Sequence, residues 1–123
     1  MSESAYKMLD QFGEGVMANV RDDALAYFDR LTSGNMADAM SQELYARYQA
    51  LNSEDAKLAR ELMAEALNAG IVRFLHHLDE HQYKLFARDD IDKQYEIIDA
   101  SDGLAGELYC EDGWTARFGR YPE

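Results

Sequence analysis

The sequence has little cysteine, little proline and few cationic side chains, and each shortage excludes a class of protein. One cysteine, Cys110, cannot build a disulfide framework or a zinc site made of several thiolates. The only proline, Pro122, stands next to the last residue, so no proline interrupts the rest of the chain. The 24 acidic side chains outnumber the 12 basic ones, and the resulting net charge of −12 argues against a general nucleic-acid binder.

Long apolar runs are also missing. No stretch approaches the roughly 18 consecutive apolar residues of a membrane-spanning helix, and the first residues lack the basic and apolar regions of a secretory signal. Anionic membrane surfaces repel a protein this acidic, and a lone thiol suits a reducing compartment. We therefore expect a cytoplasmic protein that binds neither nucleic acid nor membrane. With 123 residues, 47% of them apolar, the chain is expected to form one domain over 1–123.

The first part of the chain has the pattern of helices. Thirteen of the 17 alanines lie in the first 80 residues, and apolar residues there recur at spacings of three and four. Within a helical part spanning 4–80, we expect three antiparallel helices over 4–31, 36–51 and 53–79, or four if the glycines at 13–15 break the first. The first helix is expected to bury Met8, Phe12, Val16, Val20, Ala24 and Phe28, with Leu9, Met17, Leu25 and Leu31 widening the stripe. The third is expected to bury Leu58, Leu62, Ala66, Leu67, Ile71, Phe74, Leu75 and Leu78.

The last part has the pattern of strands and turns. Glycines divide residues 95–120 into short runs that contain aromatic and β-branched residues, and Asp112-Gly113 is a strong turn signal. A two-residue turn there would mix polar and apolar side chains on both faces. A three-residue loop pairs Cys110 with Trp114 and separates the two kinds, so we prefer it. With Tyr95–Asp99 as a preceding strand, we expect a small antiparallel meander packed on the helices, and hence an α+β fold. Residues between the two parts are not assigned.

Few residues combine into a recognisable chemical site. His76, His77 and His81 lie in one short stretch, and the last two share a helical face, as a metal-binding pair would. Further ligands at suitable spacings are missing, so we expect no metal, no cofactor and no catalytic constellation. The run Asp99–Gly103 superficially resembles a calcium loop, but its glycine comes too early and the closing glutamate is absent. Cys110 is expected to be a buried core thiol.

Negative charge is concentrated in residues 79–112, where 11 acidic side chains accompany three basic ones, a net of −8. Such a segment is a solvated face, a surface that steers a basic partner, or a mimic of nucleic acid. In the preferred register, the outer face of the meander brings together aromatic and charged side chains, a combination typical of binding hot spots. The candidate binding residues are Tyr95, Ile97, Asp99, Glu107 and Tyr109.

Our leading hypothesis is a non-enzymatic interaction protein, of the inhibitor or immunity type, whose acidic surface binds a basic protein. The alternative is a small enzyme or ligand-binding protein that uses His76, His77 or His81 for acid–base chemistry in a pocket between helices and sheet. A third hypothesis is a homodimer formed through the face of the sheet.

Overall fold

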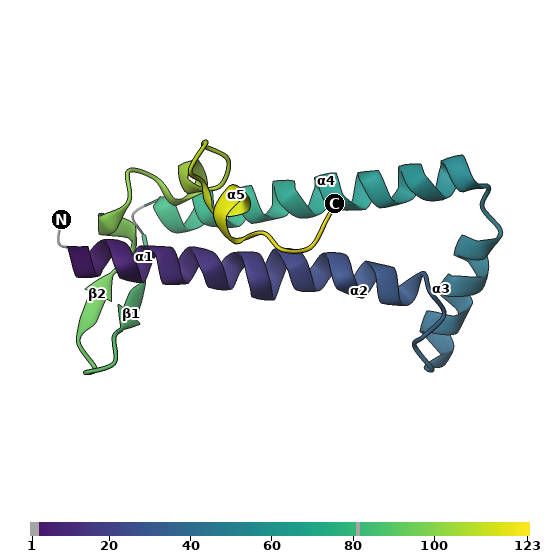
Figure 1. Cartoon of the computed structure of the whole chain (residues 1–123), viewed down its shortest axis with the longest axis horizontal. Helices are drawn as coiled ribbons and strands as arrows, with labels where there is room; N and C mark the ends of the chain where they lie inside the picture. Colours follow the sequence, from purple (N-terminus) through teal and green to yellow (C-terminus); the bar gives the residue numbers. More distant parts are fainter. Residues whose placement is uncertain (1–2, 81) are drawn as a thin grey trace.

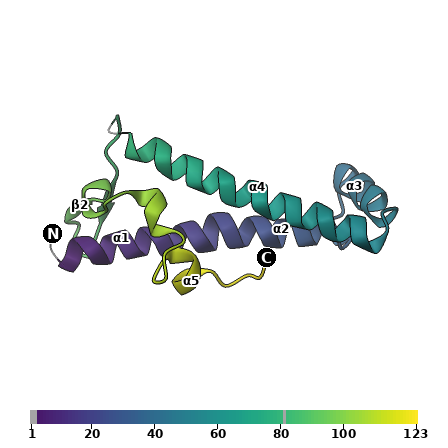
Figure 2. The ribbon, with the colours of Figure 1, turned by 90° about the horizontal axis from the view of Figure 1, so that it is seen from above.

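The computed structural model describes residues 3–80 and 82–123. Its elements, in chain order, are α1 (Glu3–Val16), the π-helical turn η1 (Met17–Asp22), α2 (Asp23–Leu31), α3 (Ala39–Gln49), α4 (Ser53–Asp79), the strands β1 (Phe86–Arg88) and β2 (Gln94–Glu96), the 3₁₀ turns η2 (Ile98–Ala100) and η3 (Leu104–Glu107), and α5 (Trp114–Phe118). Two antiparallel arms form a helical hairpin. The first arm comprises α1, η1 and α2, the second is α4, and α3 joins them at one end (Figure 1). The arms diverge toward the other end, where the strands lie (Figure 2).

The expected α+β class is confirmed, but the expected position of the β part, 95–120, is wrong beyond residue 96. The predicted strand Tyr95–Asp99 overlaps β2 at Tyr95 and Glu96, and its partner β1 precedes it in the chain. The antiparallel pair joins Phe86 to Glu96 and Arg88 to Gln94. Its turn is closed by the side chain of Asp89, whose Oδ1 accepts hydrogen bonds from two backbone amides of the same turn. This local carboxylate, in a stretch that the sequence left unassigned, therefore competes successfully with the Asp-Gly signal farther along the chain.

The segment expected to form the C-terminal hairpin is instead a set of turns that leads into a helix. Gly113 has φ −73° and ψ 170°, and it is the N-cap of α5 rather than a left-handed bulge residue. The expected pairing of Cys110 with Trp114 is absent, because the cysteine is exposed and the tryptophan is fully buried. A tryptophan has more apolar area than one face of a short ribbon can cover, and here it lies against α1.

The first arm is one continuous helix, which the glycines at 13 and 15 do not break. Gly13 instead makes room for Trp114, because a Cβ at this position would lie 2.3 Å from the indole ring. The irregularity comes later, in η1, where the wider π turn shifts the side chains relative to a regular helix. Met17 and Leu25 are therefore fully buried, whereas Val20, expected in the core, is 47% exposed.

The helix α3 is shorter than predicted. It starts after Asp38, whose Oδ2 accepts a hydrogen bond from the amide of Ser41 at 3.0 Å, so the N-cap is not at residue 35 as expected. Most of its apolar side chains are exposed, Met40 among them. Tyr45 and Tyr48 are partly buried, and the ring of Tyr48 meets Phe28 edge-on at 5.9 Å, which attaches α3 to α2.

The helix α4 has the predicted bounds, since the side chain of Asn52 accepts a hydrogen bond from the amide of Asp55 and starts the helix there. Only part of its predicted stripe is covered. Ile71 and Leu75 are buried, and Leu67 and Leu78 are partly buried. The predicted members that remain exposed are Leu58, Leu62, Ala66 and Phe74. One side of this helix therefore carries apolar residues that none of the described segments covers.

The core lies where α1, the second half of α4 and the segment after β2 meet. Its buried members are Ala5, Met8, Leu9, Met17, Ile71, Leu75, Ile97, Ala100, Leu104, Leu108 and Trp114. The last five come from the segment expected to be a meander, so that segment does supply core residues, as turns rather than strands. Within the described residues, no helix combines the length and apolar character that crossing a membrane requires.

Candidate functional site

An acidic hollow of about 590 Å³ lies where the end of α4 meets η3. Its reactive side chains are His76, Asp79, Asp102, Glu107 and Cys110. A smaller hollow of about 260 Å³ adjoins it, shares two of these aspartates and adds Asp99. We refer to the two together as the acidic hollow.

The last residue of α4 builds one wall of the acidic hollow. Asp79 accepts hydrogen bonds from the backbone amides of Leu104, at 3.0 Å, and Ala105, at 3.3 Å. The carboxylate thereby satisfies amides at the start of η3 that have no partner within the turn. These bonds hold η3 across the end of α4, although 25 residues of sequence separate Asp79 from Leu104.

The opposite wall depends on a tight turn at residues 101–107. Ser101 donates from Oγ to Oε1 of Glu107 at 2.9 Å and accepts from the amide of Gly103 at 3.1 Å. Gly103 has φ 149°, a conformation that side-chain-bearing residues rarely adopt. The turn therefore holds Glu107 in one position at the edge of the acidic hollow.

Among the residues that the structure describes, neither lysine nor arginine lines the acidic hollow. Three arginines are used in ion pairs elsewhere: Arg21 with Asp22, Arg60 with Asp29, and Arg117 with Asp10. The C-terminal end of α4 adds a partial negative charge of its own. Because a concave surface of one sign concentrates the field, the acidic hollow is suited to a cationic group.

The structure brings two of the predicted binding residues, Asp99 and Glu107, to the acidic hollow. Tyr95 lies elsewhere. It pairs with Ala87 in the β-hairpin, and its hydroxyl group donates to Asp89 at 3.2 Å. The pairing that was expected to group these residues is therefore wrong, and their role in binding stays a prediction.

The other two predicted residues have different surroundings. Ile97 is buried in the core. Tyr109 is 56% exposed, and its pKa is raised by partial burial and by the negative charge of Glu123. The tyrosines at 95 and 109 therefore do not form the joint aromatic anchor that the sequence suggested.

The described histidines, His76 and His77, are both exposed near the end of α4. His76 lines the acidic hollow, whereas the ring of His77 lies 5.0 Å from that of Tyr83. His81 lies outside the described residues. The enzyme hypothesis therefore depends on His76, which shares the hollow with a carboxylate and a thiol. In the part of the chain that the structure describes, no group of three or more His, Cys, Asp or Glu residues is arranged to hold a metal ion.

A second polar cluster, which the sequence analysis missed, holds the C-terminal tail on the helices. Arg21 and Asp22 of η1 are both buried. Arg21 donates to its neighbour Asp22 at 2.5 Å and to the carbonyl oxygen of Tyr121 at 3.0 Å, and Asp22 accepts from the amide of Arg120 at 2.9 Å. The sequence does contain a signal of this cluster, because Arg21 and Asp22 are a charged pair between positions 17 and 25, which are buried. The partners of this pair, however, lie about one hundred residues away in the chain.

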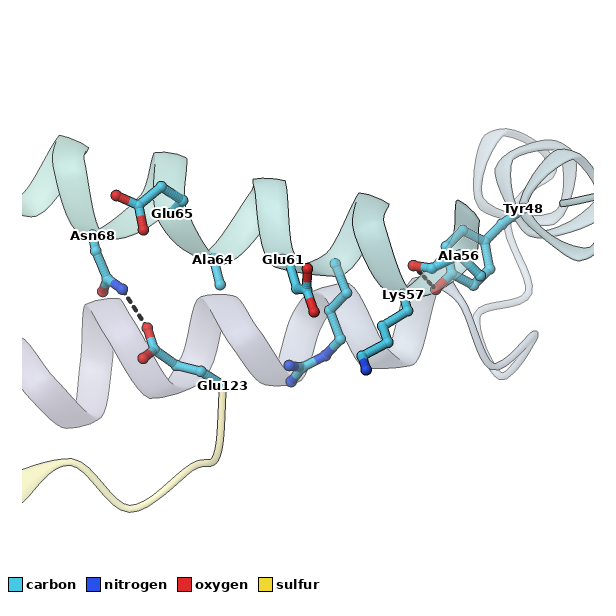
Figure 3. A pocket seen from close by; sticks show the side chains of 9 residues that line it. Tyr48, Ala56, Lys57, Glu61, Ala64, Glu65, Asn68 and Glu123 are labelled. Carbon is cyan, nitrogen blue, oxygen red and sulfur yellow. Dashed lines mark hydrogen bonds between the residues drawn. The ribbon is translucent and has the colours of Figure 1, made fainter. Parts of the chain in front are cut away.

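The tail is held a second time by Asp29 of α2. Its carboxylate accepts two hydrogen bonds from Arg60, at 2.9 and 3.1 Å, and one from the hydroxyl group of Tyr121 at 2.7 Å. Farther along, Glu123 accepts from Asn68 of α4 beside a hollow of about 490 Å³ (Figure 3). We call the contacts of residues 120–123 with Arg21, Asp22, Asp29, Arg60 and Asn68 the tail clamp. Its polar groups are already occupied by the chain's own residues.

The tail clamp makes stability depend on pH in a defined direction. The hydrogen bonds from Arg60, helped by Tyr121, lower the pKa of Asp29 below its usual value near 3.8. The stabilisation is therefore complete above that value and is lost as the pH falls through the lowered pKa. We expect Asp29→Asn to reduce the free energy of unfolding by about 1 kcal/mol near neutral pH. Urea denaturation from pH 6 down to pH 2 should show this difference shrinking toward zero, and a constant difference would contradict the prediction.

The chain matches no protein-family model, no curated protein and no solved structure. The choice between the two polar clusters therefore rests on their geometry. The tail clamp is filled by residues 120–123, whereas the acidic hollow is open and its charge is not balanced. The acidic hollow is accordingly the candidate functional site.

Proposed function

We propose that the protein is a non-enzymatic protein-binding module that receives a basic segment of another protein in its acidic hollow. One observation carries the proposal. An open hollow at the end of a long helix is lined by Asp79, Asp102 and Glu107 and continues to Asp99. None of the described residues that line it is a lysine or an arginine. A lysine or arginine side chain supplies the charge and the hydrogen-bond donors that such a surface lacks.

The surroundings of the acidic hollow extend the same charge. Seven acidic side chains of the segment 79–112 are exposed, against three basic ones. The exposed acidic residues are Glu80, Asp90, Asp92, Asp99, Asp102, Glu111 and Asp112. A field of this sign accelerates the approach of a basic protein and disfavours acidic competitors. The proposed partner is thus a basic enzyme or toxin that this protein covers or inhibits, in a reducing compartment such as the cytoplasm, where Cys110 stays a free thiol.

A peptide titration tests the proposal. The probe is a fluorescent octalysine peptide, and the variant is Asp99→Asn with Asp102→Asn, two exposed carboxylates of the hollow. We expect this double variant to weaken binding about tenfold at about 20 mM NaCl and less at about 150 mM, because salt screens exposed charges. Fluorescence anisotropy measures both dissociation constants.

The matched control removes the same charge from elsewhere. Glu14→Gln with Glu43→Gln also neutralises two exposed carboxylates, one on α1 and one on α3, far from the acidic hollow in sequence. We expect it to change binding less than about twofold. Equal losses in the two double variants would overturn the proposal, because they would show that the peptide responds only to net charge.

A further inference from the structure

One row of residues on α4 is exposed, although the sequence predicted most of it to be buried. The residues follow one another every four positions, which makes them a continuous ridge on the surface of the helix. They are Leu58, Leu62, Ala66, Gly70 and Phe74, and all five are exposed. This α4 ridge carries no charge in a protein whose net charge is −12.

The α4 ridge continues into an apolar groove of about 600 Å³ between the two arms. The groove shares Gly70 and Phe74 with the ridge, and its other wall comes from α1 and η1, including Phe12, Val16 and Val20. None of the residues from 80 to the C-terminus that the structure describes lines it. Exposed apolar surface of this extent on a water-soluble chain marks an interaction site.

Two glycines of the groove are not required by close packing among the residues that the structure describes. A Cβ at Gly70 would meet nothing within 4 Å, and one at Gly15 would meet only the side chain of Asn19 at 3.9 Å. A glycine in a helix costs about 1 kcal/mol relative to alanine. Gly13 differs, because Trp114 occupies its space. If a second molecule packed closely against the backbone of the groove, Gly15 and Gly70 would make room for it, as Gly13 makes room for Trp114.

We propose that a second copy of this chain covers the α4 ridge, with the two α4 helices antiparallel about a two-fold axis at Ala66. In this arrangement the numbers of two residues that face each other across the axis add up to twice 66. The large Leu62 then faces the small Gly70 of the other copy, and Leu58 faces Phe74. The ridge is therefore complementary in size to its own reversed copy.

The charges beside the α4 ridge are complementary in the same register. Asp55 stands near the start of the helix, whereas Arg73 and His77 stand near its end. Reversal about Ala66 sets Asp55 opposite His77 of the other copy and one turn from Arg73. The acidic and basic ends of the two helices therefore meet, and the ridge between them brings no like charges together.

A standard protein–protein interface buries about 800 Å² of each partner. A helix of 27 residues is about 40 Å long, and two adjacent helices present a face about 20 Å wide. The dimer therefore has to cover nearly the whole face, the α4 ridge and the groove beside it included. The proposal is independent of the acidic hollow, which lies at the end of α4 rather than along it.

Sedimentation of the full chain tests the association. At about 100 µM we expect a mass twice the 14.0 kDa of one chain, and we expect Leu62→Glu to raise the dissociation constant at least about 100-fold. The side chain of Leu62 is 62% exposed, so circular dichroism should show an unchanged fold. The control is Ile91→Glu in the β-hairpin turn, 83% exposed, which should stay dimeric. A wild-type monomer at this concentration would overturn the proposal and leave the ridge to a different protein.

Cross-linking tests the register. In a Cys110→Ser background, Ala66→Cys lies on the two-fold axis and should form a disulfide-linked dimer, whereas Leu62→Cys should not, because the two copies of residue 62 are about 12 Å apart along the helix. Equal cross-linking at both positions would overturn the antiparallel arrangement. Salt separates this proposal from the function proposed above: about 500 mM NaCl should weaken peptide binding and leave the dimer intact.

Discussion

Replacing Trp114 with alanine should lower the free energy of unfolding by about 3–5 kcal/mol, the usual cost of removing a buried large aromatic side chain. Trp114 is fully buried, and its ring meets Phe12 edge-on at 5.8 Å. Together with the ion pair between Arg117 and Asp10, it packs α5 on α1, because the ring fills the space above Gly13. The loss therefore includes both the apolar burial of one side chain and the docking of the C-terminal segment.

Urea denaturation followed by circular dichroism measures this change. The matched control is Tyr109→Ala, an aromatic residue of the same segment that is more than half exposed, and we expect a loss below about 1 kcal/mol. A small domain is stable by about 5–15 kcal/mol, so Trp114→Ala removes a large part of the total. A loss as small as that of the control would mean that the segment after η3 contributes little to the fold.

Gly13→Ala and Gly70→Ala should change stability in opposite directions, although both replace a helical glycine. Alanine in a helix interior normally gains about 1 kcal/mol over glycine. That gain is expected at Gly70, where a Cβ has open space. At Gly13 the Cβ would lie 2.3 Å from the ring of Trp114, and we expect a net loss of about 2 kcal/mol or more as the indole moves away.

The measurement is urea denaturation at about 1 µM, where association is weak and each chain is compared as a monomer. At higher concentration Gly70→Ala serves a second purpose. It should weaken the proposed dimer while it stabilises the monomer, because a methyl group then stands where Leu62 of the other copy approaches. If Gly13→Ala stabilises the chain as Gly70→Ala does, the tryptophan does not occupy the position described here.

The acidic hollow was predictable only in part. The charge of 79–112 is a property of composition, and the residues predicted from it include Asp99 and Glu107, which the structure brings to the acidic hollow. The grouping of these residues with Tyr95 and Tyr109 was wrong, because it depended on a strand register. The Asp-Gly pair at 112–113 is a local turn signal, but burial of the adjacent Trp114 against α1 decided how the chain leaves that turn. A local signal worth about 1 kcal/mol does not compete with burial worth several.

The sequence by itself determined the local features: the helical period, the bounds of α4, the acidity and the α+β class. These depend on residues within a few positions of each other, such as the capping of Asp55 by Asn52. Only the tertiary structure decided which side of α4 is covered, that Asp79 would hold η3, and that Arg21 would hold a tail one hundred residues away. Those contacts depend on how side-chain volumes fit and on where distant segments meet, and neither is encoded in spacing along the chain.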